Sequence, residues 1–133
     1  TKDLKFKIME YSLEGDKILA NKIYSKLYNI SNASPDDTNK SRFKFLINVI
    51  KNKKTTSKDS TGKALKYKIE LITKIEITDI SNNKVILNES FISSSSYGAQ
   101  DQYSDNIKQE NIIIKNLIDK TFEDLVLKIL NII

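Results

Sequence analysis

Strict alternation of apolar and polar residues in two neighbouring segments most constrains how this chain can fold. Every second residue from Phe43 to Val49 is apolar, and odd-numbered apolar residues from Leu65 to Ile77 mark one face of a longer segment. Side chains of a strand point alternately to its two faces, so this period of two indicates strands that are buried on one face. A strand of ~14 residues spans about 45 Å. The sequence therefore predicts two long strands and an elongated, rod-like domain.

Shorter strands are expected on both sides of this pair. An alternating segment at Leu4–Ile8 predicts the first strand, and Val85–Phe91 predicts the fourth. Glu89 interrupts the inner face of the fourth strand, which indicates an edge strand or a bulge at this point. The polar segment Lys51–Lys63 is expected to form a long hairpin tip, and Asp79–Asn83 a tight turn. Two hairpins would therefore connect the last three strands.

Helical spacing replaces the alternation in two places. After a break at Gly15-Asp16, apolar residues recur three or four positions apart from Leu19 to Ile30, as on the buried stripe of a helix. A second helix is expected from about Ser104 to the C-terminus, where Asp101 or Ser104 would accept hydrogen bonds from the free amides of the first turn. Asp105 adds a favourable charge at the same end. The apolar stripe of this second helix comprises Ile107, Ile114, Leu117, Ile118, Leu125, Ile129 and Ile132.

The predicted order is β-α-β-β-β-α, which makes residues 1–133 a single α+β domain. Its architecture is a two-layer sandwich, in which two helices pack on one face of a four-stranded mixed sheet. A β-α-β crossover makes the first two strands parallel, and two hairpins then reverse the chain twice. The hairpin tip, the turn near Gly15 and the loop Ser96–Ser104 should then gather at one end, with the N-terminus and the Asp79–Asn83 turn at the other.

Charge and composition argue against several classes of function. The formal net charge is +5, yet Arg42 is the only arginine. Base readers and phosphate clamps favour the planar guanidinium, so we expect no nucleic-acid partner. The chain has no Cys, no His and only 3 Gly, which leaves no thiol chemistry, no histidine base and no Gly-rich phosphate loop. We therefore expect no enzyme activity, no cofactor and no metal site.

Two surfaces remain as candidates for binding. The first is the lysine cluster of the predicted hairpin tip, which is either a solvated hairpin end or a cationic cluster that meets phosphates by Coulomb attraction. The second is the sheet face opposite the helices, where aliphatic residues are mixed with lysines. Isolated exposed apolar side chains are ordinary, but a contiguous patch with a lysine rim would mark a partner surface. The cationic candidates are Lys51, Lys53, Lys54, Lys58 and Lys63, and the sheet-face candidates are Leu46, Ile50, Ile72, Ile86 and Ile92.

The segment that ends the fourth strand and begins the last helix resembles a known family. A serine-rich strand end, Ser93–Ser96, is followed by Tyr97-Gly98, by Asp101-Gln102-Tyr103-Ser104, and by Glu110 and Asn116-Leu117 in the helix. This pattern is similar to that of the LptE family of lipopolysaccharide-assembly lipoproteins, and most similar to its alphaproteobacterial members. The predicted order of elements is also that of the family. We interpret the segment itself as mainly structural.

The resemblance implies a non-enzymatic lipoprotein on the periplasmic face of the outer membrane. Its membrane attachment would be a lipid on an N-terminal Cys, which we expect upstream of Thr1 after a signal peptide. Members of the family plug the barrel protein LptD and bind lipopolysaccharide during its transport. Under this hypothesis the five candidate lysines contact lipopolysaccharide phosphates. The barrel contacts would be Leu46, Ile50, Ile72, Ile86, Tyr97 and Tyr103.

Other functions are compatible with the same residues. A different periplasmic adaptor, such as an auxiliary lipoprotein of a lipid transporter, would use the same apolar sheet face. A basic nucleic-acid module would have to bind DNA at moderate salt, and an enzyme would need a cofactor or metal for which no motif is present. A signal peptide that ends in Cys upstream of Thr1 would favour the barrel plug over these alternatives.

Overall fold

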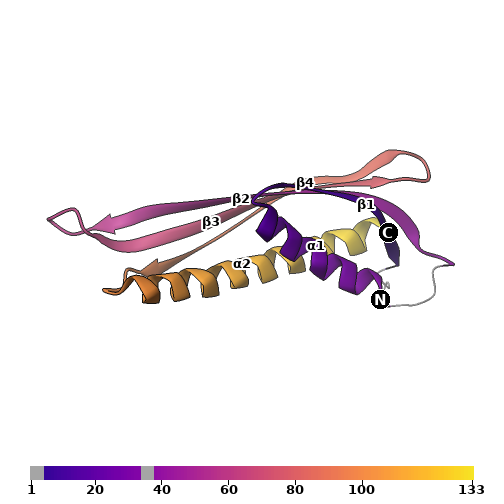
Figure 1. The fold of residues 1–133 in the computed structure, drawn as a ribbon. Helices are drawn as coiled ribbons and strands as arrows, with labels where there is room; N and C mark the ends of the chain where they lie inside the picture. Colours follow the sequence, from indigo (N-terminus) through magenta and orange to yellow (C-terminus); the bar gives the residue numbers. More distant parts are fainter. Residues whose placement is uncertain (1–4, 34–37) are drawn as a thin grey trace.

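Two layers make up the molecule, with a long sheet on one side and two helices on the other (Figure 1). The structure is a computed structural model that describes residues 5–33 and 38–133, so the expected strand residue Leu4 lies outside the described residues. Its order confirms the predicted β-α-β-β-β-α arrangement. The elements are β1 (Phe6–Gly15), α1 (Lys17–Ser31), β2 (Ser41–Lys58), β3 (Ala64–Asp79), β4 (Lys84–Gly98) and α2 (Tyr103–Ile132).

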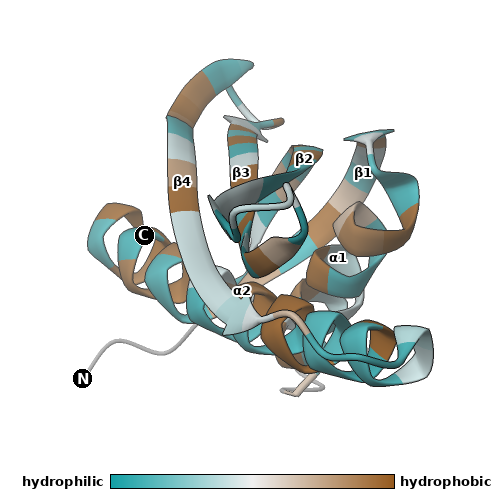
Figure 2. Ribbon diagram, turned by 90° about the vertical axis from the view of Figure 1, so that its left-hand side faces the viewer, coloured by the Kyte–Doolittle hydropathy of each residue, from teal (hydrophilic) through white to brown (hydrophobic). Residues whose placement is uncertain are grey.

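The strands form one sheet in the order β1-β2-β3-β4. β1 pairs with β2 in parallel, as expected for a crossover through α1, whereas the β2–β3 and β3–β4 pairs are antiparallel. Both helices lie on the same face of the sheet (Figure 2). The two-layer α+β sandwich with a mixed sheet is therefore confirmed.

One hydrophobic core fills the space between the layers. The odd-numbered residues from Phe43 to Val49 are at most 1% exposed, which confirms that the alternating side chains of β2 face the helices. Phe6 of β1 stacks on Phe43 with ring centroids 5.8 Å apart. Ile69 of the sheet and Ile118 of α2 belong to the same buried cluster. Burial of apolar area at about 25 cal/mol per Å² is the main force that holds the two layers together.

A bulge in β1 changes which of its side chains face the helices. The register with β2 shifts after Ile8, so that Tyr11 lies opposite Phe45. Tyr11 then stacks on Tyr24 of α1 with ring centroids 3.9 Å apart. One inserted residue reverses the alternation of a strand. The sequence pattern therefore predicted the buried face of β1 as far as Ile8 and not beyond it.

Gly15 ends β1 in a conformation that suits glycine. Its φ is +73°, and a Cβ at this position would collide with the carbonyl oxygen of Val49. Asp16 follows as the N-cap of α1, and its carboxylate accepts a hydrogen bond from the Leu19 amide at 3.1 Å. The predicted break and cap at Gly15-Asp16 are confirmed.

The predicted long hairpin tip is wrong in its extent. Pairing of β2 with β3 continues as far as Lys58 opposite Ala64, so the connecting loop contains only residues 59–63. Asp59 organises this loop, since its Oδ1 accepts a hydrogen bond from the Thr61 amide at 2.9 Å. A polar composition indicates exposed side chains, and exposed side chains do not prevent backbone pairing.

The turn at Gly15 does not lie at the hairpin tip, contrary to the expectation from topology. Gly15 lies opposite Val49, and the path along β2 from Val49 to Lys58 is about 30 Å at ~3.3 Å per residue. The β2–β3 loop and the segment before α2 do meet at one end, where the Ala99 amide donates to the Leu65 carbonyl at 2.9 Å. The β3–β4 turn lies at the other end (Figure 1). The order of elements could not reveal this arrangement, because β1 has 10 residues and β2 has 18.

β4 is an edge strand, as the position of Glu89 indicated, but its bulge lies elsewhere. The register with β3 shifts at Ile86, between the pairs formed by Val85 and Leu87. Ile86 consequently packs against the core, and Val85 is 53% exposed. Glu89 stays on the helix face, where its carboxylate lies 3.3 Å from the Lys128 ammonium of α2. The ion pair explains how a carboxylate is accommodated on that face.

The N-terminus of α2 differs from the prediction in its cap. Gln102 is the N-cap residue, and its side chain makes no capping hydrogen bond. The expected caps Asp101 and Ser104 are therefore wrong, whereas Asp105 does lie in the first turn. The position of the cap depends on where the chain leaves β4. Residue type alone does not determine that point.

The buried stripe of α2 also departs from the prediction at its margins. Ile107 and Ile132 are 39% and 37% exposed, whereas Ile113 and Thr121 are buried. The Thr121 hydroxyl is satisfied, because it donates to the Leu117 carbonyl at 2.8 Å. The two exposed isoleucines lie near the ends of this 30-residue helix, where fewer elements cover it. Within the described ranges, neither helix is long and apolar enough to cross a membrane.

Candidate functional site

Ion pairs connect the outer half of β2, which is residues 50–58, to α2. Glu110 of α2 lies between Lys51 and Lys53, with 3.5 Å and 3.1 Å between the charged atoms. The Glu110 side chain is only 15% exposed. An ion pair that is partly removed from water is screened less than a surface pair. These three residues therefore position the β2–β3 ribbon over the first half of α2.

Two tyrosines complete the environment of Lys53. Its ammonium lies 4.6 Å from the ring centroid of Tyr67 and 6.0 Å from that of Tyr97, within the range of a cation–π contact. Burial acts to lower the pKa of Lys53, but the interactions with Glu110 and with the Tyr97 hydroxyl together outweigh it and hold this pKa above its usual value. Lys53 is thus kept as a cation and is engaged within the chain.

The structure does not gather the five candidate lysines into one cluster. Lys51 and Lys53 face α2, while alternation along β2 directs Lys54 to the open face of the sheet. Lys58 is exposed at the last position of β2, and Lys63 in the loop is 3.9 Å from an acidic side chain that precedes α2. Lys54, Lys58 and Lys63 are therefore better placed than Lys51 and Lys53 to contact a phosphate.

The open face of the sheet carries one apolar row that crosses three strands. Ile50, Ile72 and Ile92 lie opposite one another in β2, β3 and β4, and we call them the isoleucine row. Ile50 is 47% exposed and Ile92 is 66% exposed. Charged residues flank the row, with Glu70 on one side and Lys74 on the other. The row is a contiguous apolar surface whose neighbours on the same face are polar, with one charged residue on each side.

The other proposed barrel contacts divide between the two faces. Leu46 is half-buried on the open face, opposite Glu76, and Tyr103 is 80% exposed at the start of α2. Ile86 packs against the core because of the bulge in β4, and Tyr97 is only 6% exposed on the helix side. The structure thus corrects the expected place of Ile86 on the open face, and Tyr97 offers little surface to a partner.

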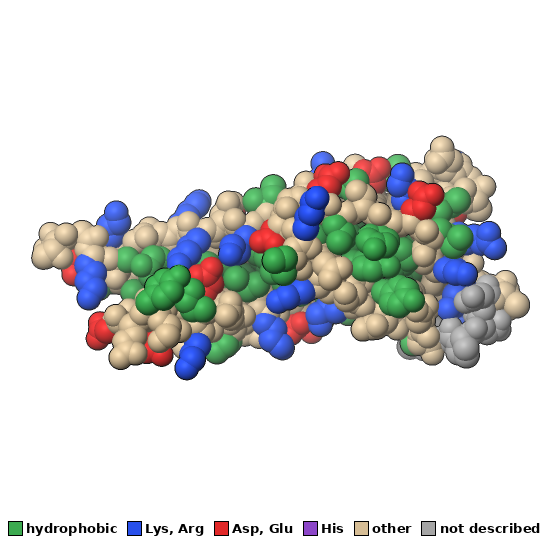
Figure 3. Space-filling model, in the orientation of Figure 1, with side chains coloured by type: hydrophobic (Ala, Val, Ile, Leu, Met, Phe, Trp, Pro, Cys, Tyr) green, Lys and Arg blue, Asp and Glu red, His purple; other side chains and the backbone are tan. Residues whose placement is uncertain are grey.

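An aromatic patch lies where α1 meets β1. The Tyr24 ring centroid lies 3.9 Å from that of Tyr11 and 6.0 Å from that of Tyr28. Burial, with the neighbouring phenols, raises the pKa of Tyr24. Tyr11 and Tyr28 are about half exposed, and Figure 3 shows apolar side chains gathered over α1, with lysines spread along the length of the molecule. The rings fasten α1 to β1 and leave an amphipathic surface.

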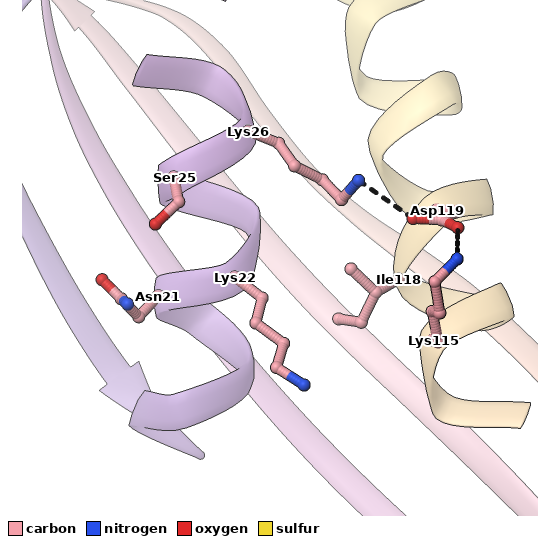
Figure 4. A pocket seen from close by; sticks show the side chains of 7 residues that line it. All are labelled: Asn21, Lys22, Ser25, Lys26, Lys115, Ile118 and Asp119. Carbon is pink, nitrogen blue, oxygen red and sulfur yellow. Dashed lines mark hydrogen bonds and ion pairs between the residues drawn. The ribbon is translucent and has the colours of Figure 1, made fainter. Parts of the chain in front are cut away.

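A hollow of about 420 Å³ lies between α1 and α2 (Figure 4). Lys26 of α1 and Lys115 of α2 both reach Asp119, at 3.0 Å and 3.2 Å. The hydrogen bond from Lys26, followed by that from Lys115, holds the pKa of Asp119 below its usual value. Lys22 also lines the hollow. The sequence analysis missed this site, whose signal was two charged pairs spaced four residues apart on the two helices.

A second hollow, of about 280 Å³, lies where β1 ends and α1 begins. It adjoins the first, since Lys22 lines both. Ile18, Leu19 and Ile114 supply apolar lining from the two helices, and Lys51 lines it from β2. No sequence pattern marked this hollow, because its walls come from three separate elements.

These surfaces combine lysines with exposed apolar side chains. Lysines beside exposed aliphatic and aromatic side chains suit a partner that combines negative charge with apolar surface. In the part of the chain that the structure describes, no group of His, Cys, Asp or Glu side chains is placed to hold a metal ion.

Known structures share this fold at low sequence identity. The minor lipoprotein from Acinetobacter baumannii superposes with a TM-score of 0.68 at 14% identity, over 96% of this chain and 93% of that chain. Rare lipoprotein B from Shewanella oneidensis gives 0.62 at 14% identity, over 92% and 97%. Uncharacterized lipoprotein B from Nitrosomonas europaea gives 0.67 at 11% identity, over 92% and 81%. The sequence matches no family model and no curated protein. The chain thus has the same α+β fold as these lipoproteins.

Proposed function

We propose that this protein is a non-enzymatic lipoprotein of the LptE kind, which acts in lipopolysaccharide transport at the outer membrane. The observation that carries the proposal is the fold, which is similar to that of proteins named lipoproteins over 92–96% of this chain. The strand end and turn at Ser93–Ser104 supply separate support from the sequence. In this role an N-terminal lipid holds the domain on the periplasmic face of the membrane, and the domain docks inside a barrel of the LptD type.

Lipopolysaccharide binding is proposed for the open face of the sheet. Lipopolysaccharide combines phosphates with acyl chains. The isoleucine row would accept an acyl chain. Lys54, together with Lys58 and Lys63 nearer the β2–β3 loop, would meet phosphates. Lys68 lies opposite Lys54 on the same face. The lysine pair lies about 13 Å from the row along the strands, at ~3.3 Å per residue. A lysine meets phosphate as a point charge, so this attraction should weaken with salt.

Salt-dependent binding tests the lysine assignment. A variant with Lys54→Ser, Lys58→Ser and Lys63→Ser should bind immobilised lipopolysaccharide more weakly and with a flatter dependence on salt, because it makes fewer charge contacts. Unchanged affinity of this variant would reject the assignment. The matched control, which should keep the affinity of the unaltered protein, carries Lys17→Ser, Lys108→Ser and Lys120→Ser.

Co-purification tests the barrel interaction. Ile72→Glu combined with Ile92→Glu places charges on the isoleucine row and should abolish co-purification with an LptD-type barrel, because a carboxylate buried in an interface without a partner is costly. The control is Leu127→Glu, at a position of α2 that is 61% exposed. If the unaltered protein purifies with components of another lipid transporter, an auxiliary lipoprotein of that transporter replaces the barrel plug as the proposed function.

A further inference from the structure

β2 has a free backbone edge along its outer half. β1 pairs with β2 only as far as Gly15 opposite Val49, where the Asp16 amide donates to the Val49 carbonyl at 2.7 Å and the chain turns into α1. β2 itself continues to Lys58. Among the residues that the structure describes, no strand pairs with β2 on this side beyond Val49. In an antiparallel ladder, alternate residues direct their N–H and C=O groups away from the partner strand. Alternate residues of the stretch 50–58 therefore direct N–H and C=O groups to a side on which no described strand pairs with them.

The second hollow lies beside the start of this free edge. Lys51 lines it from β2, and Ile18 and Ile114 line it from the two helices. Ile18 lies in the first turn of α1 and is 74% exposed. An added strand beside β2 would direct alternate side chains towards the helix layer, where the hollow is. The free edge and the hollow together form one unfilled strand position, in line with β1.

We propose that this position accepts an extended, acidic segment of a partner protein by β-strand addition. In this mode of recognition, main-chain hydrogen bonds supply affinity and pockets for alternate side chains supply specificity. The segment would place an apolar side chain against Ile18 and Ile114. Its carboxylates would lie near Lys22 of the hollow and near Lys54 and Lys58 of the edge, which makes the charges complementary. Lys51 and Lys53 are engaged by Glu110. Asp16 also lines the hollow, so an apolar side chain rather than a carboxylate would enter it.

A second copy of this chain is a poor occupant of the same position. Two β2 edges brought together would place lysines opposite lysines, and like charges directly opposite one another destabilise strand pairing. Edge lysines also discourage unselective association, so a segment of opposite charge gains most from pairing here. The free edge adjoins the isoleucine row at Ile50, but strand addition would use the backbone edge and the helix side, whereas the row lies on the open face of the sheet. Occupancy of the edge therefore does not depend on the proposed function. The two proposals can therefore fail separately.

A synthetic peptide provides the test. The probe is a capped peptide of about seven residues in which Glu and Val alternate, a length and pattern suited to strand addition. Added to the full chain, it should shift the amide resonances of residues 50–58 and of Ile18, and slow hydrogen exchange at alternate residues of that stretch. A peptide of alternating Lys and Val is the control and should not bind. No shifts at about 1 mM probe, or shifts confined to β4, would overturn the proposal.

N-methylation separates strand pairing from charge attraction. Successive amides of an extended peptide point to opposite edges, so two peptides are made. One carries N-methyl groups on the amides that would face β2 and cannot donate to it. The other carries N-methyl groups on the amides that face away from β2. Strand pairing predicts that one methylated peptide fails to bind and that the other binds like the parent. Equal binding of both methylated peptides would show charge attraction alone and would overturn the proposal.

A protein variant tests the hollow. Ile18→Ser removes an exposed apolar side chain, so it should change stability little but weaken probe binding about three- to tenfold through the lost contact. Leu127→Ser, at a position of α2 that is 61% exposed, is the matched control and should bind the probe like the unaltered protein. Equal affinities of the two variants would contradict the placement of the partner in the hollow.

Discussion

Lys53 Nζ lies 3.1 Å from Glu110 Oε2, in a contact between residues that are 57 positions apart in the sequence. Through this contact and the neighbouring pair with Lys51, the outer half of the sheet is joined to the first half of α2. The lysines that looked most available for a ligand in the sequence are therefore partly used to hold the fold together.

Removal of Glu110 should expose the contribution of these pairs. Glu110→Ala should lower the free energy of unfolding by about 1 kcal/mol, because two ammonium groups lose their partner. The lysine side chains are 34% and 41% exposed, so solvent screening keeps the loss below that of a fully buried pair. Urea denaturation measures the change. The control is Glu123→Ala, at an exposed position of the same helix. A loss no larger than that of the control would show that the ion pairs have no net effect.

Asp119 should make stability depend on pH in the acid range. Hydrogen bonds from Lys26 and then Lys115 hold its pKa in the folded chain below the usual value. A carboxyl group of this kind contributes stability that is present above its unfolded pKa of about 3.9 and is lost as the pH falls through its folded pKa. Asp119→Asn should therefore flatten the fall in stability below about pH 4. Thermal denaturation across this range measures the effect, with Asp124→Asn as control. Superimposable acid profiles for Asp119→Asn and the unaltered protein would contradict the assignment.

Gly15→Ala should destabilise the fold by roughly 1–3 kcal/mol, because φ is positive and the new Cβ meets a backbone oxygen that cannot easily move. Gly62→Ala is the matched control. Gly62 also has a positive φ, of +88°, but a Cβ there would meet nothing within 4 Å. Its cost should be only about 1 kcal/mol, from the conformation alone. Equal losses in thermal denaturation would mean that the close approach to Val49 adds no strain.

Ile118→Ala should be among the costly substitutions in α2, with a loss of about 2–5 kcal/mol, because it leaves a cavity between the helix and the sheet. Ile118 is 2% exposed and belongs to the single core. Ile92→Ala removes the same atoms from the open face, where the side chain is 66% exposed, and should cost less than about 0.5 kcal/mol. Similar urea midpoints for the two variants would contradict the assignment of the faces of the sheet.

Several features of the fold were predictable because they depend on the spacing of apolar residues within one short segment. The odd-numbered residues of β2 from Phe43 to Val49 alternate without interruption, and their burial confirms the face that they predicted. The break and cap at Gly15-Asp16 also depend on neighbouring residues alone. β1 was harder to predict, because its bulge after Ile8 brings Tyr11 to the helix side only through pairing with β2.

The candidate site was less predictable than the fold. The lysine-rich composition of residues 51–63 was evident, but a cluster at a loop was expected. Pairing with β3 instead extends β2 to Lys58 and separates Lys53 from Lys54, which face opposite sides of the sheet. The ion pair with Glu110 and the second hollow had no local signal, since each is formed by residues distant in the sequence.

The sequence by itself determined the number, type and order of the elements and the buried face of β2 and β3. These properties follow from the period of a strand or a helix, which neighbouring residues express without reference to the rest of the chain. Only the tertiary structure decided that Gly15 lies opposite Val49, that Ile50, Ile72 and Ile92 align in one row, and that no described strand pairs with the outer edge of β2. Register and edge exposure depend on how far one strand runs past another, and packing of the whole chain sets that distance.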